Sequence, residues 1–196
     1  LLRDGNGTAF DDSGADDNSY FIRPTATTDR FNLLTRGFYL FDTSAIPDTD
    51  TIDSAIFSLY PTVVNDDATI DPKAGLVLAT IASNTAVAAS DYQGTNGNVT
   101  RQANDIDYGA IVINQYNDWA ILSAQLTNIS KTGVTKYGTK LGQDIDNSIV
   151  WANVAARNIN NRTADTADTT SDPKLAVTHT AGGAVAGRST AFSLMG

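Results

Sequence analysis

Short apolar runs alternate with turn-forming residues along most of the chain. The longest apolar run covers residues 31–42 (FNLLTRGFYLFD), and the segment around Pro47 then interrupts it with Asp and Thr. A second run at residues 55–60 alternates with a period of two, which is typical of a β-strand with one buried face. We therefore expect two strands here, joined by a turn that sends the second back antiparallel or across to a facing sheet. The side chains expected in the interior are Phe38, Leu40, Phe57 and Leu59.

The same reading extends to the rest of the chain and predicts about ten short strands. Besides the two above, strands are expected at residues 20–23, 76–82, 110–114, 119–122, 135–142, 148–154 and 174–180. One or two short helical turns are expected, at residues 87–92 and 126–131. Many short strands with turn signals between them indicate an all-β protein, an antiparallel β-sandwich. We expect an arm or loop at residues 1–19, the sandwich at 20–180 and a small-residue-rich tail at 181–196.

The composition supports the β assignment. All 22 acidic residues are Asp, and the chain contains no Glu. Asp favours turns and caps, whereas Glu favours helices. Thr is frequent, and its β-branched side chain favours strands. These preferences predict a mostly β chain with many Asp, Asn and Gly turns.

The net charge of −9 restricts the partners that the chain can be expected to have. Nucleic acids and anionic membrane surfaces attract basic patches, so neither is expected as a partner. No apolar run approaches the length of about 18 residues that spans a bilayer, so no membrane insertion is expected. The chain has no cysteine, which excludes disulfides and thiolate metal sites. An acidic, soluble surface suits an extracellular setting, on a cell or on a virion.

Catalysis has little support in the sequence. The only histidine is His179, so a Ser-His-Asp site would have to use it, and we expect it instead in a terminal strand. A glycosidase needs two carboxylates about 5–10 Å apart, and 22 Asp residues could supply such a pair by accident. Most of them lie in turn contexts. We therefore expect a protein that is not an enzyme.

Calcium is the one cofactor that the sequence suggests. Its preferred ligands are six to eight oxygen atoms, and the loop near the amino terminus concentrates oxygen donors. The alternative is a solvated acidic loop in an acidic protein, and the spacing is not that of an EF-hand. Weaker candidates are the segments at residues 65–67 and 144–147. The candidate ligands in the first loop are Asp11, Asp12, Asp16, Asp17 and Asn18.

Sugar binding is the alternative functional hypothesis. Aromatic rings that stack on sugar faces, with amide or carboxylate groups beside them, would provide such a site. Trp151 and Tyr108 are further aromatic candidates, although Trp and Tyr in a sandwich more often pack in the core or at an edge. The most sugar-like constellation is Tyr116, Asn117, Asp118 and Trp119.

The segment TRGFYLFDTSAIPDTDTIDSAIFSLY resembles the hallmark of the DNRLRE-type extracellular domains. TNISKTGVTKYGTKLG and DTTSDPKLAVTHT resemble two later segments of that family, with Lys140 where Arg is usual and His179 in an aromatic position. The resemblance runs in order over roughly residues 20–180. The residues that match the central motif are Arg36, Phe41, Asp42, Ile46, Pro47, Ile52, Ser54, Ala55, Leu59 and Tyr60.

The resemblance implies a jelly-roll-like β-sandwich of the kind found in secreted, cell-surface and phage-associated proteins. It implies no catalytic residue, because its motif consists of core and turn positions. The sequence thus favours a structural or adhesive building block of a surface assembly, a phage decoration or fibre protein or a cell-surface filament subunit. Its expected partners are copies of itself or other subunits, joined through termini and edge strands. A carbohydrate-binding module, stabilised by calcium, is the alternative.

Overall fold

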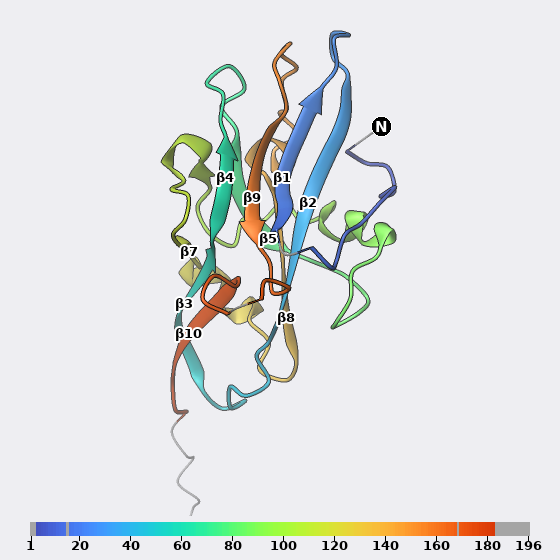
Figure 1. The fold of residues 1–196 in the computed structure, drawn as a ribbon. Helices are drawn as coiled ribbons and strands as arrows, with labels where there is room; N and C mark the ends of the chain where they lie inside the picture. Colours follow the sequence, from blue (N-terminus) through green and yellow to red (C-terminus); the bar gives the residue numbers. More distant parts are fainter. Residues whose placement is uncertain (1–2, 15, 168, 183–196) are drawn as a thin grey trace, which may run out of the picture.

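The computed structural model describes residues 3–14, 16–167 and 169–182, and it shows an all-β, jelly-roll-like sandwich (Figure 1). The side chains of residues 16–20 lie outside this description. All strand pairings are antiparallel among the described residues. The predicted fold class is therefore confirmed.

Two sheets form the sandwich. The larger has the order β4-β9-β1-β2-β8-β5-β6 and the smaller the order β10-β3-β7. The strands of the larger sheet are β4 (Pro61–Asn65), β9 (Arg157–Arg162), β1 (Asp16–Pro24), β2 (Phe31–Asp42), β8 (Val134–Leu141), β5 (Lys73–Leu78) and β6 (Ile106–Asp107). Those of the smaller sheet are β10 (Lys174–Thr180), β3 (Thr51–Leu59) and β7 (Asn117–Ala120). The turn after β2 carries the chain across to the facing sheet, one of the two predicted outcomes.

Only short helical elements connect the strands. Three are 3-10 helices, η1 (Ala89–Thr95), η2 (Tyr108–Ala110) and η3 (Ser123–Asn128), and one is the α-helical turn α1 (Gly142–Ile145). η1 and η3 overlap the two predicted helical turns. In Figure 1, η1 (green) lies beside the amino-terminal arm (dark blue) on one side of the larger sheet.

Phe57 lies at the centre of the core between the sheets. Its ring is 5.1 Å from that of Tyr39, 5.8 Å from Trp119 and 6.0 Å from both Phe41 and Tyr137, measured between centroids. The predicted burial of Phe57 and Leu59 is confirmed.

The prediction that Phe38 and Leu40 face the interior is wrong. Tyr39 and Phe41 pack on Phe57, and side chains alternate along a strand, so the even-numbered positions of β2 point to the outer face of the larger sheet. Phe38 and Leu40 are half-buried there. Residues 38–41 (FYLF) are all apolar or aromatic, so their composition does not determine which face of β2 is inward.

Several predicted boundaries also need correction. β1 begins at Asp16, inside the predicted arm. Residues 110–114 form no strand, because the Asn117 side chain bonds both backbone groups of Val112, at 2.9 and 2.8 Å, and takes the place of a ladder partner. Residues 148–154 form no strand either, and Ile149 packs against the core cluster. The predicted strands at 31–42 and 174–180 agree with β2 and β10.

The sequence reading missed β9 because its residues, RNINNR, carry only one apolar side chain. The strand is held by ladders on both sides, to β1 and to β4. Backbone pairing therefore defines this strand, and hydrophobic periodicity does not reveal it.

Candidate functional site: a buried ionic cluster beneath the amino-terminal arm

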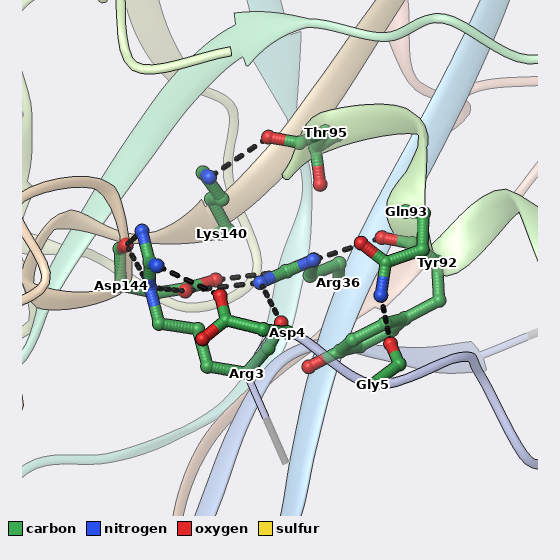
Figure 2. Close-up of polar contacts among 9 residues, drawn as sticks. All are labelled: Arg3, Asp4, Gly5, Arg36, Tyr92, Gln93, Thr95, Lys140 and Asp144. Atoms are coloured by element: carbon green, nitrogen blue, oxygen red, sulfur yellow. Dashed lines mark hydrogen bonds and ion pairs between the residues drawn. The ribbon is translucent and has the colours of Figure 1, made fainter. Parts of the chain in front are cut away.

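The most unusual polar feature of the described chain is a group of charged side chains on the outer face of the larger sheet. We call Arg3, Arg36, Lys140 and Asp144, together with Tyr92, the ionic cluster (Figure 2). Each member comes from a different segment: the arm, β2, β8, α1 and η1. The alternation of β2 directs Arg36 to the outer face, the same face as Phe38 and Leu40.

Arg36 and Asp144 form the centre of the cluster. The Arg36 Nε donates to Asp144 Oδ2 at 2.8 Å and the Nη2 donates to Asp144 Oδ1 at 3.0 Å. Both side chains are fully buried. A planar guanidinium that meets both oxygens of a carboxylate is the strongest geometry for such a pair. Charges this far from water are tolerated only when they are paired and hydrogen-bonded.

The remaining donors of Arg36 fasten two further segments. Its Nη1 donates to the carbonyl of Tyr92 at 2.8 Å and its Nη2 donates to the carbonyl of Arg3 at 3.1 Å. The guanidinium also lies 4.1 Å from the centroid of the Tyr92 ring, a cation–π contact. Burial raises the pKa of the Tyr92 hydroxyl to about 12, against the opposing effect of Arg36. Tyr92 therefore stays neutral in the physiological range.

Arg3 closes the cluster from the arm. Its Nε lies 3.1 Å from Asp144 Oδ1, and its Nε and Nη2 donate to the Asp144 carbonyl at 3.1 and 3.0 Å. A second bond joins the arm to η1, because the Gln93 side chain donates to the carbonyl of Gly5. The arm is thus bonded both to α1 and to η1, as Figure 2 shows.

Lys140 is the most strongly perturbed cation of the cluster. Its side chain is fully buried, and its Nζ donates to the Thr95 carbonyl at 2.9 Å. Burial lowers the pKa of the Lys140 ammonium to about 8, and Asp144 only partly offsets this effect. Arg36, Arg3 and Arg101 add repulsion that acts in the same direction as burial.

Close packing brings η1 into reach of Lys140. Gly138, two residues before Lys140 on β8, faces Thr95, and a Cβ at Gly138 would overlap the Thr95 methyl group. A glycine within a strand often marks such a close approach of another segment. The arrangement lets the end of η1 lie directly on the sheet.

A second arginine extends the polar layer toward the surface. Arg101 makes two-point contacts with Asp105, at 2.9 Å each, and with Asp146, at 2.8 Å each. Hydrogen bonds from Arg101 lower the pKa of Asp146. The carboxylates of Asp105, Asp144 and Asp146 are therefore each paired with an arginine. The last two belong to the weaker calcium candidate at residues 144–147.

The ionic cluster can hold segments of the chain together. Its guanidinium and carboxylate groups bond to one another and to main-chain carbonyls, and Arg36 and Asp144 have no contact with solvent. The cluster fastens the arm, η1 and α1 to β2 of the larger sheet.

The four residues of the sugar hypothesis do not form an exposed stacking face. Trp119 is 1% exposed and donates its Nε1–H to the Ala74 carbonyl of the facing sheet at 3.2 Å.

The Lys174 ammonium lies over the Tyr116 ring, 3.5 Å from its centroid, and the Tyr116 hydroxyl donates to the carbonyls of Thr170 and Asp172. Asn117 is buried and bonds Val112, while Asp118 is exposed and accepts from Ser58 at 2.6 Å. Only two of the four, Tyr116 and Asp118, are not buried.

The calcium hypothesis stays a prediction. Asp11 and Asp12 are exposed in the arm, and Asp11 accepts the Ser13 N–H at 3.1 Å. The backbones of Asp16, Asp17 and Asn18 belong to β1, but their side chains lie outside the described part of the structure. Among the side chains that are described, no three acidic or imidazole groups lie close enough together to hold a metal ion.

His179 lies on β10, an edge strand, as the sequence predicts. Its Nδ1 is 2.7 Å from Asp50 Oδ2, and Asp50 also accepts the Gly182 N–H at 3.3 Å. Burial works against the charge on Asp50, but the bonds from His179 and Gly182 outweigh it and lower its pKa. The pair fastens the end of β10 to the loop before β3.

Sequence reasoning did not assign a role to any member of the ionic cluster. Arg36 entered only as a motif residue, and Asp144 only as a weak calcium candidate. The available signal was the position of cations within predicted strands, Arg36 in FNLLTRGFYLFD and Lys140, with Lys136, in VTKYGTKL. Nothing in the sequence indicates that Arg3 and Asp144 would meet them.

Comparisons with known proteins assign the chain to no family. No protein-family model matches it, and no curated protein sequence matches it significantly. In the part of the chain that the structure describes, no helix is both long and apolar enough to cross a membrane.

Proposed function

We propose that the protein is a non-catalytic structural or adhesive building block of an extracellular surface assembly, either a virion decoration or fibre protein or a cell-surface filament subunit. The observation that carries the proposal is the ionic cluster. Arg36, Lys140 and Asp144 are fully buried and bonded within the protein, so they hold segments in place and do not face a substrate. Such fastening suits a unit that must stay folded and resist proteases outside a cell.

Edge strands provide the means of joining neighbours. Among the described strands, β4 and β6 lie at the edges of one sheet, and β10 and β7 at the edges of the other. Edge strands present backbone groups that can pair with another chain. β10 is the longest of these edges, and most of its residues are exposed.

An exposed apolar patch beside β4 supports the same proposal. Val63 is 39% exposed, and Val112 and Ile113 are 49% and 47% exposed. The two segments are adjacent, because the Asn114 N–H donates to the Pro61 carbonyl at 2.7 Å. Contiguous exposed apolar side chains often mark protein contact sites.

Electron microscopy of the concentrated, purified chain tests this function. We expect regular polymers or arrays in negative stain, in which the subunit repeats with one spacing. Dispersed single particles at every protein concentration and salt condition would refute an assembly made of this chain alone. In that case a surface extract from the source is added to the chain. Absence of co-assembly with the extract would refute the broader proposal as well.

A further inference from the structure

The larger sheet divides between β1 and β2. The ladder between these strands runs from the Pro24 end to the pair Tyr20 and Arg36, and there it stops. Beyond this point β1 continues along β9, down to the pair Asp16 and Arg162. β2 continues along β8 instead, through the pairs from Gly37 to Asp42. The two halves of the sheet therefore separate below Arg36.

A groove of about 520 Å³ lies at this division. One wall is the stretch of β2 from Gly37 to Phe41, where Phe38 and Leu40 are half-buried. The other walls are the arm just before β1, the loop after β9 and residues 84–87. The Thr163 hydroxyl donates to the Gly14 carbonyl and ties two of these walls together. The groove thus combines an apolar wall with the end of a strand ladder.

The rim of the groove is acidic. Asp11, Asp12 and Asp165 line it and are exposed, and no Lys or Arg is among its described lining residues. A complementary occupant would be an extended segment with alternating apolar side chains and a positive charge.

We propose that the groove receives residues 188–195 of a second copy of this chain, added as a strand beside β2. This inference rests on the proposed function and names the contact that would join neighbouring subunits. The segment RSTAFSLM has Phe192 and Leu194 two positions apart, which places them on one face of an extended strand. Arg188 is the only charged side chain from residue 183 to residue 196, and its sign is opposite to that of the rim. These residues lie outside the part of the chain that the structure describes.

The path of β10 favours the tail of another copy over the chain's own tail. Pro173 lines the groove, and β10 then runs along β3 for seven residues, about 23 Å of extended chain (Figure 1). Six residues lead from Gly182 to Arg188 and span at most about 22 Å. The chain's own tail would have to turn back and run fully extended to bring Arg188 to the rim, whereas a neighbouring subunit is under no such restriction.

Directed disulfide formation tests the contact, because the chain has no cysteine of its own. Two singly substituted chains, Leu40→Cys and Phe192→Cys, are mixed under mild oxidation, with a mass tag on one. We expect at least about tenfold more disulfide-linked heterodimer than in a control mixture of Leu40→Cys with Val150→Cys, because docking raises the effective concentration of the thiols. Val150 is 71% exposed and lies outside the groove. Phe38→Cys, checked for folding by circular dichroism, replaces Leu40→Cys if that chain does not fold.

The remaining outcomes each overturn a stated part of the account. An internal disulfide in the dilute double variant Leu40→Cys/Phe192→Cys, with no heterodimer in the mixture, would show that the chain's own tail fills the groove. Absence of both disulfides, while the unsubstituted chain still assembles, would refute this inference and leave the proposed function intact. Failure of the unsubstituted chain to assemble with itself would refute this inference together with an assembly made of this chain alone.

Discussion

The Arg36 guanidinium and the Asp144 carboxylate meet through two hydrogen bonds of 2.8 and 3.0 Å, with both side chains fully buried. The two residues are 108 positions apart in the sequence, so their pairing fixes the start of α1 against β2. A buried pair of this kind need not add much net stability, since desolvation offsets its attraction. Removing one partner is different, because it leaves a charge that is buried and uncompensated.

Replacement of Asp144 by Ala is therefore expected to destabilise the fold by about 3–5 kcal/mol, measured by chemical denaturation at pH 7. The control is Asp146→Asn, whose side chain is 53% exposed and whose partner Arg101 keeps Asp105. This control is expected to cost less than about 1 kcal/mol. The double variant Arg36→Met/Asp144→Leu should recover most of the lost stability. Equal effects of Asp144→Ala and Asp146→Asn would show that the buried pair is not the central fastening.

Arg3 is expected to hold the arm on the sheet. Arg3→Ala removes the bonds to Asp144 and should cost about 1–3 kcal/mol, with faster hydrogen exchange concentrated in residues 3–7 and 89–95. Asp4→Ala is the matched control, because it removes only an exposed ion pair with Arg3 and leaves the bonds of Arg3 to Asp144. Unchanged exchange in η1 after Arg3→Ala would argue against a link through the arm.

The pKa of Lys140, lowered to about 8 by burial, predicts a specific pH dependence. Below about pH 8 both the folded and the unfolded chain carry the ammonium, so its burial cost is present in full. Between about pH 8 and 10.5 the folded chain loses the proton while the unfolded chain keeps it, and stability at this site rises with pH.

Comparison with Lys140→Met isolates this contribution. We expect the free energy of unfolding of the native chain, relative to that of Lys140→Met, to increase by roughly 1–3 kcal/mol from pH 7.5 to pH 10. Urea denaturation at several pH values measures the difference. A difference that stays constant, or that falls as the pH rises, would contradict the assignment of Lys140 as a buried, strained cation.

Gly138 is expected to be required for the contact between η1 and the sheet. Gly138→Ala places a methyl group against Thr95 and should destabilise the fold by about 1–3 kcal/mol through overpacking. Gly97→Ala is a suitable control, because a Cβ there meets no atom within 4 Å. Thermal unfolding of both variants provides the measurement, and a neutral Gly138→Ala would show that η1 can move away without cost.

The sequence predicts the sandwich well where a strand has one apolar face. β3 follows this rule, with Phe57 and Leu59 inward, and β10 is found at its predicted bounds. β9 was missed because ladders on both sides stabilise it despite its polar residues. β2 was located correctly but with the wrong face inward, since Phe38 and Tyr39 are equally compatible with a core.

The ionic cluster was beyond sequence reasoning for a different reason. Arg3, Arg36 and Asp144 come from distant parts of the chain, and their meeting depends on how the arm and α1 are placed against β2. A charge within a largely apolar strand, such as Arg36 in β2, signals a buried polar partner, but the pattern does not identify that partner. The aromatic residues of the sugar hypothesis illustrate the converse, since Trp119 lies in the core and not at a surface.

Sedimentation velocity of the intact chain tests the central claim, assembly, most directly. The account predicts that the weight-average sedimentation coefficient increases as the protein concentration rises from about 1 μM to about 1 mM, because association follows mass action. A single monomeric species with a constant sedimentation coefficient over that whole range would contradict it.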